Sequence, residues 1–345
     1  YVKQSQFHVF GVTTIIIALI TYCMAPIIST QPSWFYVMVV VTVLLLTELK
    51  HTFTEFAQRM KNDEMITLAK FLAISGIILP MLPHKNLIPD INLTPYSIWL
   101  ATVVVSGISY LSYLLKRYVF HESGTLVSGI IGGLYSSTAT ISVLARKSRK
   151  ASEQEATDYV AAMLLAVSMM FLRFMILILI FSREIFLSIY PYLLTMAVVA
   201  AIVAWFIHSR QKRPEGQSAE TEEDDSSNPL EFKVALIFAV LFVIFTFLTH
   251  YTLVYAGTGG LNLLSFVSGF SDITPFILNL LQNTGSVAAL IITACSMQAI
   301  ISNIMVNMFY ALFFAGKGSK LRPWILGGFG VVITCNLVLL LFFYI

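Results

Sequence analysis

Residues 232–255 read FKVALIFAVLFVIFTFLTHYTLVY, and residues 322–345 read RPWILGGFGVVITCNLVLLLFFYI. A helix of about 20 apolar residues crosses the hydrocarbon core of a bilayer, so each stretch is long enough to span it. Within lipid, backbone polar groups are satisfied only in helices or closed barrels. The short alternating strands of a barrel are absent from the sequence. The two stretches therefore predict transmembrane α-helices.

The composition extends this prediction to the rest of the chain. Of its 345 residues, 57% are hydrophobic and 11% are charged, and the mean hydropathy is +0.82. Soluble proteins carry about 25% charged residues. The net charge is only +3, and the charges lie mostly between apolar runs, which argues against nucleic acid as a partner. We expect membrane lipid to surround most of the chain.

Apolar runs of spanning length predict an all-α, polytopic transmembrane helical bundle with roughly ten or eleven spans. They lie at 9–29, 33–50, 64–82, 95–115, 125–145, 157–181, 187–208, 232–255, 261–281, 286–315 and 322–345. Two runs are marginal, because 125–145 is rich in Gly, Ser and Thr and 261–281 contains Asp272 and Pro275. Either can be a broken or re-entrant helix.

The pattern divides the chain into five parts. We expect N-terminal transmembrane helices at 1–50, an interfacial amphipathic helix at 51–63, a first bundle half at 64–210, a disordered polar loop at 211–230 and a second bundle half at 231–345. Because the chain starts at Tyr1 rather than at Met, we also expect residues to be missing before it. The three cysteines lie in apolar spans without metal-site spacing, so we expect them to act as small hydrophobic residues.

Two segments resemble a diverged internal repeat, GGLYSSTAT from Gly132 and FVSGFSDITP from Phe266. A shift of about 136 positions places Gly133 on Gly269, Ser136 on Asp272 and Thr138 on Thr274. Paired interrupted helices in repeats mark substrate sites in secondary transporters. Chance matching of Gly and Ser between membrane helices is the alternative explanation.

Three ionisable residues lie away from the ends of their predicted spans: Arg173, Asp272 and, about two turns into its span, Lys70. Charges at membrane depth are costly and are usually functional. Because Arg173 and Asp272 have opposite charges and fall in the two repeat-like halves, we hypothesise that they face one polar cavity. The alternative is that Arg173 extends to a lipid headgroup while Asp272 caps a half-helix.

The predicted ion or solute pathway consists of Gly133, Ser136, Ser137, Thr138, Arg173, Asp272, Thr274 and Asn303. Hydroxyls beside glycines can bind ions in a broken helix, or can simply hold helices together. The polar face formed by Ser296, Gln298, Ser302, Asn303 and Asn307 can complete the cavity or bond to a neighbouring helix. With one central acid, a dehydrated Mg²⁺ cage is not expected. We predict no cofactor and no enzymatic activity, because no catalytic or nucleotide-binding motif is present.

Four stretches carry a resemblance to a known family: KFLAISGIILPMLP (70–83), LTPYSIW (93–99), GGLYSSTATISVLARK (132–147) and MMFLR (169–173). The chain resembles the uncharacterised C-terminal region of bacterial MgtC/SapB-related membrane proteins. Its N-terminal MgtC part is not visible. The resemblance implies a multi-pass protein of the bacterial inner membrane. MgtC-type proteins are linked to growth in low magnesium and to modulation of the ATP synthase.

Together these features predict a transporter-like or channel-like protein for a small ion or polar solute. The alternative is a non-transporting regulatory subunit, related in behaviour to MgtC, that binds a membrane protein partner or a second copy of itself. If every run spans, the basic residues fall on both sides: Arg146, Lys147, Arg149, Lys150 and Arg210 lie on one side, and Lys116, Arg117 and Arg322 on the other. The cluster after the fifth span is the densest, so we expect its side to be cytoplasmic.

Overall fold

The computed structural model describes residues 12–30, 32–48, 62–88, 91, 93–120, 124–149, 151, 153–210, 232–282, 287–316 and 321–344. Apart from an isolated bridge between Ile88 and Ile91, regular structure in these ranges is helical. Seven of the helices are long and apolar enough to cross a membrane, and four shorter apolar helices accompany them. The prediction of an all-α, polytopic helical bundle is confirmed.

The chain forms two compact units, Tyr1–Ala69 and Lys70–Ile345. The first contains α2 (Val12–Thr30) and α3 (Ser33–Glu48), and α5 (Asn62–Ala73) crosses the boundary between the units. The predicted interfacial helix at 51–63 lies outside the described residues except for its last two positions, which begin α5. The predicted loop at 211–230 lies outside the described residues altogether.

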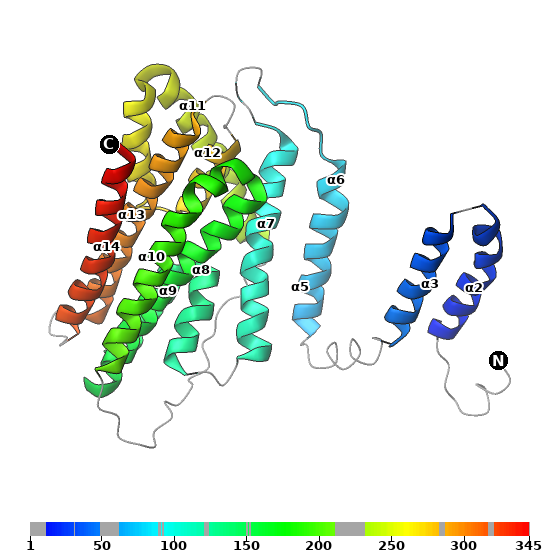
Figure 1. The fold of residues 1–345 in the computed structure, drawn as a ribbon, viewed down its shortest axis with the longest axis horizontal. Helices are drawn as coiled ribbons and strands as arrows, with labels where there is room; N and C mark the ends of the chain where they lie inside the picture. The colour runs from blue at the N-terminus through cyan, green and yellow to red at the C-terminus, as the bar shows by residue number, and fades with distance from the viewer. Residues whose placement is uncertain are drawn as a thin grey trace. The chain divides into compact units, whose positions relative to one another are not determined.

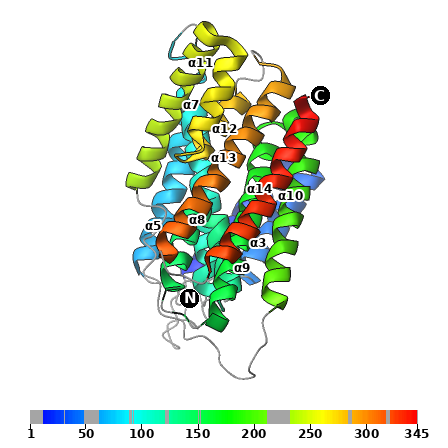
Figure 2. The same cartoon turned by 90° about the vertical axis from the view of Figure 1, so that its left-hand side faces the viewer.

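The second unit holds the features that matter for function (Figures 1 and 2). Its helices are η1 (Ile74–Ile78), α6 (Leu79–Met81), α7 (Pro95–Leu114), η2 (Leu115–Val119), α8 (Thr125–Lys147), α9 (Glu153–Phe181), α10 (Arg183–Ser209), α11 (Phe232–Ser268), α12 (Ile273–Gln282), α13 (Ala289–Ala315) and α14 (Arg322–Tyr344). Polar caps define two of the starts: Thr94 and Ser97 form a capping box on α7, and Ser182 caps α10. α14 packs on both α10 and α13.

The helix α8 consists of two halves joined at Ser136, whose backbone is extended with φ −158° and ψ 106°. A β-carbon at Gly132 would lie 2.5 Å from Oγ1 of Thr140, eight residues further on. In a continuous helix, residues with this spacing are separated by about 12 Å along the axis. The halves α8a (125–135) and α8b (137–147) therefore fold back on each other, and we call the pair hairpin 1.

The packing of α8a shows where hairpin 1 opens. Gly129 contacts Ala162 and Gly133 contacts Ala166, so α8a runs parallel to α9. If α8 were straight, Lys147 would lie about 40 Å from the start of α9. The intervening residues 148–152 reach only about 20 Å. Hence α8b returns to the end of the bundle at which α8a begins.

A second hairpin follows the same plan. α11 reverses at Gly257 (φ 60°, ψ −152°) into α11a (232–256) and α11b (258–268), and Figure 2 shows this reversal at the top of the bundle. α11b and α12 then form hairpin 2, which breaks at residues 269–272. The amide of Asn303 on α13 donates to the Gly269 carbonyl at 3.2 Å. The Gln282 amide donates to the Ser97 carbonyl at 3.3 Å, which places the open end of hairpin 2 beside the start of α7.

The two hairpins belong to an internal repeat in which α7, hairpin 1, α9 and α10 correspond to α11a, hairpin 2, α13 and α14. A shift of 136 positions carries the first residue of α9, Glu153, onto that of α13, Ala289. The close contact of Gly133 with Ala166 recurs as that of Gly269 with Ser302. Each repeat contains three full helices and one hairpin. Each full helix crosses the bundle once, whereas a hairpin returns to the end at which it entered. After three crossings the second repeat starts at the end opposite to the start of the first, so the repeats run in opposite directions and their hairpins enter from opposite ends.

Helices α9 and α13 are the most buried of the seven candidate spans. Phe171 on α9 and Phe276 on α12 are fully buried, as are Phe242 on α11a and Phe329 on α14. The hydroxyl of Ser168 on α9 donates to the Ala197 carbonyl on α10 at 2.8 Å. This close-packed interior holds the two hairpin tips in fixed positions.

Candidate functional site

The tips of the two hairpins are built in the same way. The Ser136 hydroxyl accepts a hydrogen bond from the Ala139 N–H at 3.3 Å and so caps α8b. The Asp272 carboxylate accepts one from the Thr274 N–H at 3.0 Å and so caps α12. These two caps occupy equivalent positions in the repeats. Each tip therefore presents the N-terminus of a half-helix, where backbone N–H groups lack partners within the helix.

Both tips face one cavity of about 410 Å³, which lies within the usual size range of small-molecule sites, about 300–1,000 Å³. All eight residues of the predicted pathway line it: Gly133, Ser136, Ser137, Thr138, Arg173, Asp272, Thr274 and Asn303. The structure thus brings together all eight positions of the predicted pathway. Their role in conduction stays a prediction.

The lining of the cavity follows the internal repeat. Equivalent residues face it in pairs: Val105 and Leu241, Tyr135 and Ser271, Ser136 and Asp272, Ser137 and Ile273, Thr138 and Thr274, Met170 and Val306, Phe174 and Tyr310. The pairs combine apolar walls from the full helices with polar tips from the hairpins. The cavity therefore lies on the pseudo-symmetry axis that relates the two repeats.

Arg173 supplies a cationic group to this cavity from α9. Its Nη1 donates to the carbonyl of Tyr135, the last residue of α8a, at 2.7 Å. Its Nε is buried and has no hydrogen-bond partner. Because the side chain turns toward hairpin 1, it does not extend to a headgroup in the way that the alternative interpretation of the sequence required.

Arg173 and Asp272 share the cavity, as hypothesised, without direct contact. No nitrogen–oxygen distance between these two described residues is 4.0 Å or less, although the carboxylate attracts the guanidinium electrostatically. Asp272 also caps α12, so the alternative role that the sequence suggested for it holds as well. Arg173 and Asp272 therefore do not form a direct ion pair in the cavity.

Three residues of the polar face of α13 form hydrogen bonds within the bundle. The Ser302 hydroxyl donates to the Phe266 carbonyl at 2.7 Å, and the Asn303 amide donates to the Gly269 carbonyl. The Asn307 amide in turn donates to the Asn303 side-chain oxygen at 3.1 Å. The first two bonds satisfy backbone carbonyls at the break after α11b, and the third orients the Asn303 side chain. Only Asn303 of this face lines the cavity, while Ser302 and Asn303 make the bonds to a neighbouring helix that the sequence offered as the other alternative.

The sequence did not predict several residues that line the cavity. Ser106 and Ser109 contribute hydroxyls from α7, and Ser271 lies at the tip of hairpin 2. Ser271 lies 136 positions after Tyr135, so the repeat offset could have pointed to it as the equivalent of Tyr135. The serines of α7 carry no such signal, because hydroxyl residues are common between membrane helices.

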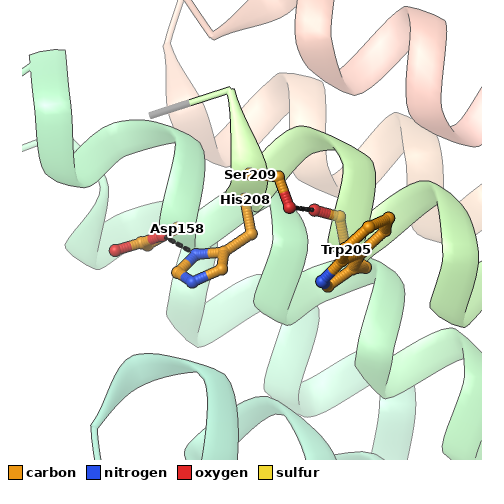
Figure 3. Close-up of polar contacts among 4 residues, drawn as sticks. All are labelled: Asp158, Trp205, His208 and Ser209. Atoms are coloured by element: carbon orange, nitrogen blue, oxygen red, sulfur yellow. Dashed lines mark hydrogen bonds and ion pairs between the residues drawn. The ribbon is translucent and has the colours of Figure 1, made fainter. Parts of the chain in front are cut away.

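A second polar contact lies outside the cavity, between Asp158 in an early turn of α9 and His208 in the last turn of α10 (Figure 3). Their Oδ1 and Nδ1 atoms are 2.6 Å apart, and both side chains are part-buried. The second repeat has Ala294 and Tyr344 at the equivalent positions. The contact therefore joins two helix ends within one repeat. In the described part of the chain, no three His, Cys, Asp or Glu residues come together as metal ligands would.

These observations define a multi-pass α-helical membrane protein with two opposed half-helix hairpins around a polar cavity. The chain belongs to the family defined by the domain of unknown function DUF4010, whose model matches residues 103–315. That match includes both hairpins and both of the helices that pack against them, α9 and α13.

A relative from Aquifex aeolicus (strain VF5), named an uncharacterized protein, is 25% identical over 227 residues. The alignment covers 64% of this chain and 96% of that protein. No solved structure matches the chain. Neither description mentions MgtC or SapB, so the more specific resemblance stays a prediction.

Proposed function

We propose that this protein is a transporter or channel that moves a small ion or polar solute through the cavity between the two hairpins. One observation carries the proposal: two half-helix breaks, from repeats of opposite direction, line the same cavity. Irregular backbone is tolerated at membrane depth where it lines a polar cavity, and secondary transporters place their substrate sites at such breaks.

The side chains suit this role. Hydroxyls of Ser136, Ser137 and Thr138 can replace the hydration that an ion loses on entering the membrane. Arg173 supplies a positive field, and Asp272 can exchange a proton or bind a coupling cation. The resemblance to MgtC/SapB-related proteins supports a bacterial inner-membrane location. We propose no enzymatic role, since these groups do not form a nucleophile with a base.

Reversible blockade of the cavity tests the proposal. Ser271 is exposed at the tip of hairpin 2, and Ser209 is exposed outside the cavity at the end of α10. In a background lacking Cys23, Cys295 and Cys335, we expect a charged methanethiosulfonate reagent to reduce ion flux through Ser271→Cys protein at least tenfold, and a reductant to restore it. Ser209→Cys is the matched control and should keep its flux.

The measurement is electrogenic or isotopic flux in proteoliposomes, with sodium, potassium, chloride, sulfate and phosphate as probes. Absence of flux for all five probes, or flux that ignores modification of Ser271→Cys, would contradict a conducting role. Co-purification with a membrane partner under those conditions would favour the regulatory alternative.

The hairpin topology also predicts an orientation. It brings Lys116, Arg117, Arg146, Lys147, Arg149, Arg210 and Arg322 to one end of the bundle, because hairpin 1 returns to the end where it entered. Arg149 confirms the proximity, since its Nη2 donates to the Phe313 carbonyl near the end of α13 at 3.2 Å. Figures 1 and 2 show the end of α10 and the start of α14 at this same end. By the positive-inside rule this end is cytoplasmic.

Labelling of single cysteines in intact cells tests the orientation. We expect Arg183→Cys, at the α9–α10 turn, to react with an impermeant maleimide from outside. Ser209→Cys, at the opposite end of α10, should react only after the membrane is permeabilised. The reverse pattern would place the basic end outside, and reaction of both sites from outside would contradict a spanning α10.

A further inference from the structure

We propose that the ligand bound between the two hairpins is a small inorganic anion, an inference that rests on the proposed transport role and names its substrate class. The groups at the cavity that favour an anion are two half-helix N-termini and one guanidinium. Each of these attracts negative charge, and each is contributed by a different structural element.

The N-termini of α8b and α12 are the first contribution. Both half-helices have ten or more residues, long enough for their backbone dipoles to align. The caps on Ser136 and Asp272 engage the N–H groups of Ala139 and Thr274. The other N–H groups of the first turns have no partner within their helices. Such ends bind phosphate, sulfate and similar anions in many proteins.

Arg173 is an independent second contribution. Its Nε–H is buried without a partner, while its Nη1 is held by the Tyr135 carbonyl. A charged group at membrane depth needs counter-charge or hydration. Guanidinium binds oxyanions through several parallel hydrogen bonds, and Arg173 lines the cavity with a guanidinium whose donors the protein satisfies only in part.

The carboxylate of Asp272 is the only described acid on the cavity wall, and its charge offsets that of Arg173. The helix dipoles at the tips also offset one another, because each half-helix N-terminus carries a partial charge of about +0.5 and the C-termini of α8a and α11b carry about −0.5 each. Side chains already bond the carbonyls of Tyr135, Phe266 and Gly269 at those C-termini, whereas N–H groups at the two N-termini have no partner within their helices. The groups left open at the tips are therefore donors, which favour an anion, while a cation would depend on Asp272, so the two ligand classes predict opposite effects of neutralising Asp272.

Equilibrium binding of radiolabelled sulfate, phosphate and chloride to the purified full chain tests the proposal, with sodium held constant and gluconate as the balancing anion. We expect at least one of the three anions to bind. Its affinity should fall about 10- to 150-fold in Arg173→Gln, the loss that corresponds to hydrogen bonds with a charged group. Arg183→Gln, which removes an exposed arginine from the start of α10, is the matched control and should bind as the wild type does.

Asp272→Asn separates the ligand classes, because asparagine caps a helix about as well as aspartate but lacks the charge. An anion site should bind equally well or more tightly in this variant. The proposal is overturned if wild-type protein binds none of the three anions, a measurement that does not depend on any variant folding. It is also overturned if labelled sodium binds instead and is lost in Asp272→Asn. Anion binding without flux in proteoliposomes would refute the transport role and leave the anion site standing.

Discussion

Replacing Gly133 by alanine should destabilise the protein by about 3 kcal/mol, at the upper end of the usual cost of overpacking. A β-carbon there would lie 2.5 Å from Cα and 2.6 Å from the carbonyl oxygen of Ala166. Both are backbone atoms, so a side-chain rotation cannot relieve the clash. Hairpin 1 would have to move away from α9, and its tip would leave the cavity. Denaturant or thermal unfolding in detergent measures the change.

The repeat provides an internal replicate of this prediction. Gly269 meets Ser302 and the backbone nitrogen of Asn303 in the equivalent place, so Gly269→Ala should cost a similar amount. Gly327 and Gly330 on α14 have open space where a β-carbon would lie, and alanine there should change stability by no more than about 0.5 kcal/mol. Equal stability of Gly133→Ala and Gly327→Ala would show that α8a does not pack on α9 as described.

Gly257→Ala should cost about 1–3 kcal/mol for a different reason. With φ 60° and ψ −152°, this residue occupies a backbone region that is open almost exclusively to glycine. Nothing lies within 4 Å of a β-carbon at this position, so the cost is purely conformational. It arises at the reversal between α11a and α11b, which directs hairpin 2 back into the bundle.

The neighbouring Gly259 is the matched control, because it has neither a positive φ nor a close neighbour at the β-carbon position. Gly259→Ala should be neutral, or slightly stabilising through the higher helix propensity of alanine. Thermal or denaturant unfolding of both variants and of the wild type measures the difference in stability. If Gly257→Ala is as stable as Gly259→Ala, the chain does not reverse at residue 257 in the way that the structure describes.

The helical spans were predictable because apolar length is the dominant signal in a membrane protein. The length of the apolar runs does not predict the reversals at Ser136 and Gly257. A helix of 23 residues and two antiparallel halves of about half that length have the same mean hydropathy. The Gly, Ser and Thr content of 125–145 indicated a possible break but not its direction, which depends on the contacts of Gly129 and Gly133 with α9.

The candidate site was predictable to the extent that it uses rare residues. Arg173 and Asp272 stand out because charges at membrane depth are uncommon, and the offset of 136 positions is enough to link Ser136 to Asp272 by sequence alone. Their separation was not predictable, because it depends on Arg173 binding the Tyr135 carbonyl. The roles of Ser302 and Asn307 were equally hidden, since helix-to-helix hydrogen bonds and cavity lining use the same side chains.

The opposite directions of the two repeats have a consequence for conformational change. Two halves with the same fold and inverted orientation can exchange their conformations at little cost in free energy, because each half already contains the structure that the other would adopt. Such an exchange would close the cavity toward one compartment and open its mirror-related path toward the other.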